Sequence, residues 1–256
     1  GNKRGILVDI AESLDKNDVK FETVLDLFSG SGVVSLFFKL IGKTVYSNDL
    51  LTSSYYNALA LCENNSPTGL TREELNFLCK NNNPSKGDFI QVNYANRFTP
   101  QEAQFLDNYR ANVETLVHNT YHKDLLSSQT RPNGPNTAWV LRSMEFKRAL
   151  AILAITHYVL NRCFLGGRLN KGQVLADLDH RLSHDRNKGE SMAFSVDPLP
   201  VFFNPEVEDT CQAWNLDALI ATKQIGIDRG WPQVAYIDPP YGGRQSDYST
   251  MFSFCE

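Results

Sequence analysis

The sequence predicts an α/β protein whose parallel sheet is interrupted by a mostly helical insertion. Near the N-terminus, short apolar strands alternate with helices around a tight glycine turn. The same alternation resumes close to the C-terminus, whereas the residues between follow a helical pattern. Strands that alternate with helices along a chain pair in parallel. We therefore expect a discontinuous core made of residues 1–64 and 206–256, into which residues 65–205 are inserted.

The first part of the core is predicted to hold five elements. Apolar residues at helical spacing indicate a helix over 5–15. The strand-forming residues of 22–28 (ETVLDLF) lead into the glycine turn. A helix over 33–41 follows that turn, and then a strand over 44–47 and a helix over 51–63.

The insertion is predicted to be helical from the helix-start patterns in its sequence. Thr71 and Glu74 have the spacing of a capping box, and Thr99 with Pro100 indicates a second helix start. A long apolar pattern over 143–165 indicates a buried helix. Its polar residues leave fewer than the roughly 20 apolar residues that a membrane span requires.

The second part of the core is predicted to contain two further strands. Residues 210–214 form one strand, which leads into a turn at Asn215–Asp217 and a short helix. Residues 234–237 (VAYI) form an apolar strand that runs directly into residues 238–241 (DPPY). We expect residues 242–256 to form a loop beside that motif.

The composition is that of a globular protein. The 256 residues are 42% hydrophobic and 21% charged, which excludes a disordered chain and a coiled coil. The net charge of −4 means that a nucleic-acid partner would be held by a local basic patch. The five cysteines are scattered without a C-x-x-C motif, which favours a reducing compartment over a disulfide scaffold or a four-cysteine zinc site.

The first chemically informative motif is residues 26–32 (DLFSGSG), a strand end followed by G-x-G. Glycine lets the backbone turn sharply and approach a ligand, and ligands of open α/β sheets lie at the carboxyl ends of the strands. Asp49, at the end of the next strand, is placed to accept hydrogen bonds from a ribose. The alternatives are an ordinary strand-to-helix turn and, for Asp49, a helix N-cap. A nicotinamide site is disfavoured because no third glycine completes the fingerprint.

The DPPY sequence is the most specific motif in the chain. Its two prolines lack N–H donors and fix the turn. Asp238 and the neighbouring carbonyl therefore form a site made of acceptors alone, which suits an amino group with two N–H donors. Tyr241 offers a flat face to an extruded base. The alternative is a rigid loop that merely leaves a strand.

In this order the motifs resemble the DNA adenine-N6 methyltransferases of the Dam-like class, alpha group, over residues 1–63 and 208–249. The resemblance implies a Rossmann-like core that uses S-adenosylmethionine, no metal, and a target-recognition role for residues 65–205. It implies the following catalytic residues: Asp238, Pro239, Pro240 and Tyr241. It also implies the following cofactor-binding residues: Lys3, Asp26, Phe28, Ser29, Gly30, Gly32, Asp49 and Asp217.

The same resemblance implies a mechanism and partners. Asp238 and the Pro239 carbonyl would accept both N–H bonds of the adenine amine, and Tyr241 would stack on the flipped base. The implied partners are double-stranded DNA and a cognate restriction nuclease, for a cytoplasmic protein of prokaryotic or phage origin without a membrane partner. Two alternatives stay open: methylation of another amine, such as cytosine N4, an RNA adenine or a protein amide, and a methyltransferase-like DNA-binding module without catalysis.

Contacts with DNA are not determined by the sequence of the insertion. The basic residues within 168–188 either bind phosphate or form a solvated mixed-charge surface, and the same two interpretations apply to Arg142, Lys147 and Arg148. His180 and His184 lie four residues apart, but the segment lacks the Glu of an H-E-x-x-H motif, so we favour no metal there.

The family's core has more strands than the four that this sequence predicts. In the family's strand order, residues 234–237 would be left as an open apolar edge, which proteins normally cover. We therefore expect the rest of the core to come from residues or a partner outside this sequence.

Overall fold

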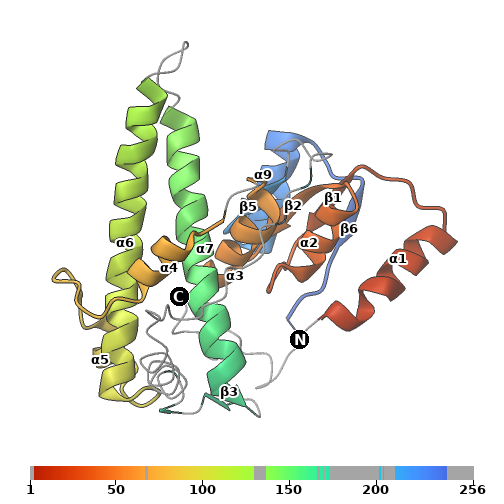
Figure 1. Cartoon of the computed structure of the whole chain (residues 1–256). Helices are drawn as coiled ribbons and strands as arrows, with labels where there is room; N and C mark the ends of the chain where they lie inside the picture. Colours follow the sequence, from red (N-terminus) through yellow and green to blue (C-terminus); the bar gives the residue numbers. More distant parts are fainter. Residues whose placement is uncertain are drawn as a thin grey trace. The chain divides into compact units, whose positions relative to one another are not determined.

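The chain forms two compact units, residues 1–68 with 201–256 and residues 69–200. They are seen in a computed structural model (Figure 1). The structure describes residues 3–66, 69–129, 137–165, 168–169, 171–172, 174, 202, 204 and 211–240. We call the first unit the core unit and the second the helical unit.

The core unit contains a four-stranded parallel sheet in the order β5-β2-β1-β6 (Figure 1). Its strands are β1 (Thr23–Asp26), β2 (Thr44–Asn48), β5 (Gln212–Trp214) and β6 (Val234–Tyr236). This confirms the predicted fold class, a partial Rossmann-like core with helices around a parallel sheet. Each strand lies within its predicted range or within one residue of it. Within this sheet β6 is an edge strand, as the family's strand order implied.

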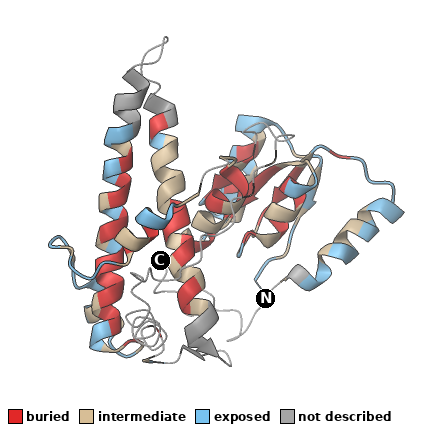
Figure 2. Cartoon of the chain, in the orientation of Figure 1, coloured by how far each residue is buried: buried red, intermediate tan, exposed pale blue. Residues whose placement is uncertain are grey.

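Helices flank the sheet, and successive strand residues point to opposite faces. Val24 and Val45 pack into an apolar cluster with α1 and α2, whereas Leu25 and Tyr46 pack into a second cluster with α9. Figure 2 shows β1 and β2, the two central strands, among the buried parts of this unit. The helical elements of the core unit are η1 (Lys3–Ile6), α1 (Leu7–Lys16), α2 (Val33–Leu40), α3 (Thr52–Ala58), η2 (Leu59–Glu63) and α9 (Ala218–Arg229).

The predicted helix over 51–63 changes character in its second half. It begins as α3 and ends as η2, a π-helical turn in which the Asn64 N–H donates to the Leu59 carbonyl five residues earlier. The buried Glu63 carboxylate in this turn accepts the N–H of Ala213 at 2.8 Å. The wider turn therefore ties the end of this helix to β5.

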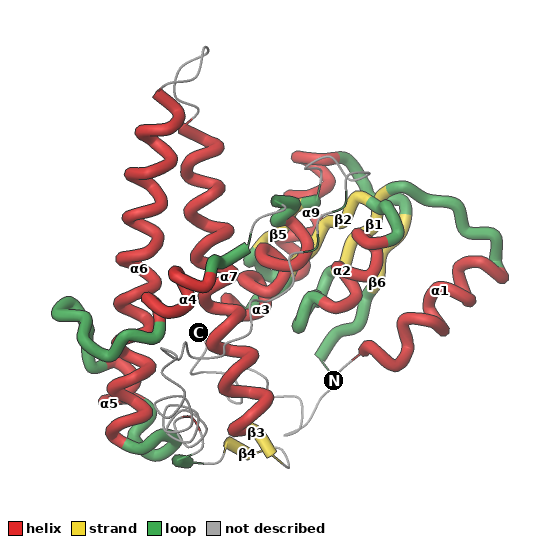
Figure 3. Tube along the Cα trace, viewed as in Figure 1, coloured by secondary structure: helices red, strands yellow, loops and turns green. Residues whose placement is uncertain are grey.

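The helical unit is dominated by two long helices that lie side by side and antiparallel (Figures 1 and 3). The Tyr109 hydroxyl on α6 donates to the Ala151 carbonyl on α7 at 2.8 Å. The predicted helix over 143–165 begins earlier, at Thr137, because it packs along α6, and it ends at Cys163 where a short antiparallel strand pair follows. The elements of this unit are α4 (Arg72–Leu78), α5 (Phe89–Asn93), α6 (Pro100–Gln129), α7 (Thr137–Cys163), β3 (Phe164–Leu165) and β4 (Arg168–Leu169).

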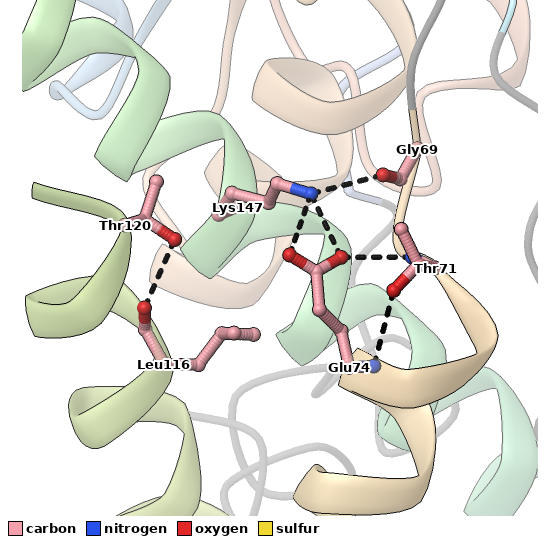
Figure 4. A network of polar contacts seen from close by, with 6 residues as sticks. All are labelled: Gly69, Thr71, Glu74, Leu116, Thr120 and Lys147. Carbon is pink, nitrogen blue, oxygen red and sulfur yellow. Dashed lines mark hydrogen bonds and ion pairs between the residues drawn. The ribbon is translucent and has the colours of Figure 1, made fainter. Parts of the chain in front are cut away.

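A polar network links the start of α4 to α7 (Figure 4). Thr71 and Glu74 form the predicted capping box, with the Thr71 hydroxyl accepting from the Glu74 N–H and the Glu74 carboxylate accepting from the Thr71 N–H. The ammonium of Lys147 on α7 donates to both carboxylate oxygens of Glu74 and to the Gly69 carbonyl, at 2.8–3.0 Å. One carboxylate therefore caps α4 and anchors it to α7.

Among the described residues, every helix falls short of the length or the apolarity that a membrane span requires.

Replacing Lys147 tests this network. Lys147→Met keeps the apolar stem of the side chain but removes the donor to three acceptors, so we expect the free energy of unfolding to fall by about 2 kcal/mol. Urea unfolding followed by circular dichroism measures the change. Lys123→Met, at an exposed position on α6, is the matched control and should stay within about 0.5 kcal/mol of the wild type. Equal stability of the two variants would contradict a stabilising role for the network.

Candidate functional site

The carboxyl ends of β1 and β6 bring two of the predicted site residues to one edge of the sheet. Asp26 is the last residue of β1, and Asp238 follows the end of β6 by two residues. The chain builds the sheet outward from β1 through β2 to β5 and then returns to the other side of β1 with β6. Such a reversal of strand order is where open α/β sheets place their ligands.

The glycine turn after β1 adopts a backbone conformation that requires glycine. Gly30 and Gly32 have positive φ angles of 52° and 72°, and the Gly32 N–H donates to the Ser29 carbonyl at 2.8 Å. A Cβ at Gly32 would lie 3.5 Å from the backbone of Asn57. The Asn57 side chain in turn donates to the Gly30 carbonyl at 3.2 Å. The turn is therefore compact and is held from α3.

Asp49 binds the glycine turn directly. Its Oδ2 accepts the Gly30 N–H at 2.8 Å and its Oδ1 accepts the Leu51 N–H at 2.9 Å. The sequence left open the alternative that Asp49 is the N-cap of the following helix. The N-cap of α3 is Leu51, two residues later, so this alternative is wrong. Two site residues from consecutive strands are thus joined by a hydrogen bond.

Asn48, which sequence reasoning did not assign to the site, connects three strand ends. Its buried amide donates to the carbonyls of Leu27 and Leu216 and accepts the Leu216 N–H, while its own carbonyl accepts the Ser29 N–H. Asn215 adds two donations, to the carbonyls of Asp49 and Leu50 at 2.9 Å. The available sequence signal was an asparagine at the end of a predicted apolar strand, directly before Asp49.

Asp26 is a buried acid with a raised pKa. Its Oδ2 accepts the Ser35 hydroxyl at 2.7 Å, and Ser35 accepts from the Ser47 hydroxyl at 2.8 Å. Burial raises the pKa of Asp26 to about 7, against the opposing effect of the Ser35 hydrogen bond. The negative charges of Asp49 and Asp238 add to the rise. Ser35 was not predicted, although a lone polar residue in the apolar run VVSLFF was a signal for it.

Two polar atoms near the turn are buried without a hydrogen-bond partner among the described residues. They are Oδ1 of Asp26 and Oγ of Ser29. Buried polar atoms are normally paired, so such exceptions point to a ligand or an ordered water. These acceptors suit a ligand that carries positive charge and hydroxyl groups, because the negative charges of Asp49 and Asp238 act on the Asp26 carboxyl group at the same end of the sheet.

Asp238 is paired with Lys3. The Lys3 ammonium lies 2.7 Å from Oδ2 of Asp238, and the two side chains are 23% and 19% exposed. Pro239 and Pro240 are exposed beyond the end of β6. Tyr241 lies outside the described residues, as do the N-terminal Gly1 and Asn2 and residues 242–256.

The remaining predicted site residues have local roles in the fold. Phe28 is half-buried against the apolar cluster on the α9 side of the sheet. Asp217 is exposed and caps α9 by accepting the Leu219 N–H at 2.9 Å. Asn215 ties the turn that carries Asp217 to Asp49, so this turn lies beside the end of β2.

The basic residues suggested as DNA contacts are engaged within the helical unit. Lys147 binds Glu74, and Arg148 binds Glu114 at 2.8 Å. The Arg142 guanidinium lies 5.4 Å from the centre of the Phe146 ring. The His180 and His184 pair and most of the basic residues within 168–188 lie outside the described residues. In the part of the chain that is described, no group of three or more His, Cys, Asp or Glu is arranged to hold a metal.

These features are typical of a Rossmann-like protein with a ligand site at the end of its sheet. They are the glycine turn, the acid after the next strand and the further acid across the reversal of strand order. The chain belongs to the D12 class N6 adenine-specific DNA methyltransferase family, whose profile matches residues 1–163. The match includes the glycine turn and Asp49 and ends before the DPPY motif.

Curated relatives align with the whole chain. It is 28% identical to the modification methylase StsI of Streptococcus sanguinis and spans 35% of that protein. It is also 28% identical to the type II methyltransferase M2.HphI of Haemophilus parahaemolyticus and spans 68% of it. No solved structure matches the chain.

Replacing Gly32 tests the turn. Gly32→Ala places a Cβ on a residue with positive φ, which costs about 1–2 kcal/mol in an L-residue, so we expect that loss in the free energy of unfolding. Gly5→Ala is the matched control in the same unit, since its Cβ would meet nothing within 4 Å. Denaturant titrations compare the two, and a stable Gly32→Ala variant would show that the turn relaxes without cost.

The raised pKa of Asp26 predicts a pH dependence of stability. Between pH 3.8 and about 7 the folded protein keeps a proton that the unfolded chain has released. Stability therefore falls as the pH rises through this window, by at most about 4 kcal/mol. Asp26→Asn removes this term, so its stability relative to the wild type should increase from pH 5 to pH 8 in urea titrations. Asp9→Asn, at an exposed position on α1, should track the wild type at both pH values.

Proposed function

We propose that this protein transfers a methyl group from S-adenosylmethionine to the N6 amine of adenine at specific sites in DNA. The observation that carries the proposal is the position of Asp238 at the strand-order reversal, beside Asp26 and the glycine turn. Membership in the D12 class family and the names of two modification methylases among its relatives support the same activity.

The described residues fit S-adenosylmethionine. This cofactor supplies an activated methyl group on a positively charged sulfur. Asp26, through its unpaired Oδ1, is placed to accept a hydrogen bond from a cationic group of the cofactor, and Ser29 offers a second polar atom. Asp49 would accept from a ribose hydroxyl in addition to its backbone donors, because each carboxylate oxygen has two acceptor sites. We propose that Phe28, Gly30, Gly32 and Asp217 complete the cofactor site, and that Lys3 lies beside it in contact with Asp238.

The catalytic role of Asp238 follows from the chemistry of an aromatic amine. The adenine amine is a poor nucleophile because its lone pair is delocalised into the ring. An ionised Asp238 and the Pro239 carbonyl would accept both N–H bonds and so favour the pyramidal nitrogen of the transition state, which is stronger binding of that state than of the substrate. Pro240 fixes the turn, and Tyr241 would stack on the extruded base. The amine proton is lost to solvent after transfer.

We propose double-stranded DNA as the substrate and restriction–modification as the setting, with a cognate nuclease as a partner. The helical unit would then supply target recognition. An aspartate in the first position of the motif favours adenine over cytosine N4, and digestion of modified DNA followed by nucleoside analysis separates these products. A DNA-binding module without catalysis would show no cofactor binding.

Replacing Asp238 tests the proposal. Asp238→Ala should lower the transfer of labelled methyl groups to DNA by at least about 100-fold, because it removes the acceptor for the amine. Binding of S-adenosylmethionine should be largely retained. Asp228→Ala, at an exposed position on α9, is the matched control and should keep full activity. Full activity of Asp238→Ala would overturn the assignment.

A further inference from the structure

An ion pair connects the start of the chain to the DPPY motif. Lys3 lies on η1, before the first helix of the core unit, whereas Asp238 follows β6. Their charged groups are 2.7 Å apart, and more than three quarters of each side chain is shielded from water. The ion pair therefore brings η1 directly to the predicted catalytic carboxylate.

The charges around Asp238 give this pair a particular significance. Lys3 on η1 contacts Asp238, and the negative charges of Asp238 and Asp49 both act on Asp26 at the end of β1. Like charges at short range disfavour simultaneous ionisation, so one acid of such a cluster tends to keep its proton. A cation in contact with Asp238 favours the ionised form of that acid.

We propose that Lys3 is a positioning residue for Asp238, which it keeps ionised and oriented for the substrate amine. This inference rests on the proposed function. It differs from the role that family resemblance implies for Lys3, because the ammonium contacts the catalytic motif instead of serving only the cofactor.

The ion pair with Lys3 is compatible with the proposed role of Asp238 toward the substrate amine. A carboxylate has two oxygens with about four acceptor sites, and an ammonium on Oδ2 uses one of them. The contact with Lys3 therefore does not by itself prevent Asp238 from accepting an N–H bond of the adenine amine. A protonated Asp238 would lose acceptor capacity and present an O–H donor to that amine. Keeping Asp238 ionised in the presence of Asp26 is thus a condition for the reaction.

Two substitutions of Lys3 and a matched control test the role by kinetics. Lys3→Met should lower kcat for DNA methylation about tenfold or more and move the acidic limb of the kcat–pH profile to higher pH. Lys3→Arg should restore both. Lys20→Met removes the exposed Lys20–Asp18 pair in the same unit and should change neither. The affinity for S-adenosylhomocysteine without DNA should stay within about threefold in all variants.

A measurement on the free protein makes the test independent of catalysis. Carboxyl-carbon NMR, with the Asp238 resonance assigned from Asp238→Asn, should show the pKa of Asp238 rising by about one unit or more in Lys3→Met and not in Lys3→Arg. An unchanged Asp238 pKa, or a large loss of S-adenosylhomocysteine affinity with an unmoved pH limb, would overturn the proposal. A wild-type protein without methyl transfer would instead overturn the proposed function, while the NMR titration still decides the role of Lys3.

Discussion

The site depends on how the polar backbone groups at the carboxyl ends of the strands are hydrogen-bonded. A parallel sheet leaves polar backbone groups at these ends, and here the buried side chain of Asn48 satisfies those of the segments that follow β1 and β5. Its own carbonyl fixes Ser29, the residue before the glycine turn. The single residue Asn48 therefore determines where the glycine turn lies relative to the end of β5. The Asp49–Gly30 hydrogen bond then completes the same arrangement from the next residue.

Three acids gather at this edge of the sheet, and each is accommodated in a different way. Asp26 is buried and keeps its proton up to a pH of about 7. Asp49 accepts two backbone N–H groups, and Asp238 has the ammonium of Lys3. Without these three compensations, the like charges would oppose folding. Under the proposed function, the three acids are chemically distinct acceptors for the cationic group of the cofactor, its ribose and the substrate amine.

Most elements of the core could be predicted because they depend on residues close together in the sequence. The contacts between residues far apart in the sequence could not be predicted. The glycine turn and the Thr71–Glu74 capping box follow from residues within a few positions of one another, so their sequence patterns are specific. The role of Asn48 depends on hydrogen-bond partners from distant parts of the chain. The Lys3–Asp238 ion pair likewise depends on two segments that only folding brings together. The full extent of α6 was not predicted, because buried Asn and Asp side chains within it interrupt the apolar periodicity.

The hydrogen bonds between the end of η2 and the returning chain have a consequence for how the inserted segment can vary. The side-chain amide of Asn65 pairs with the backbone of Asn204, donating to its carbonyl and accepting its N–H, both at 3.0 Å. Glu63 makes a similar connection to β5. These hydrogen bonds join the two ends of the core unit between which the inserted segment begins and ends. The entropy cost of closing a loop grows slowly with its length. These hydrogen bonds therefore allow the inserted segment to be lengthened, shortened or exchanged between relatives. The acids of the core would keep their geometry.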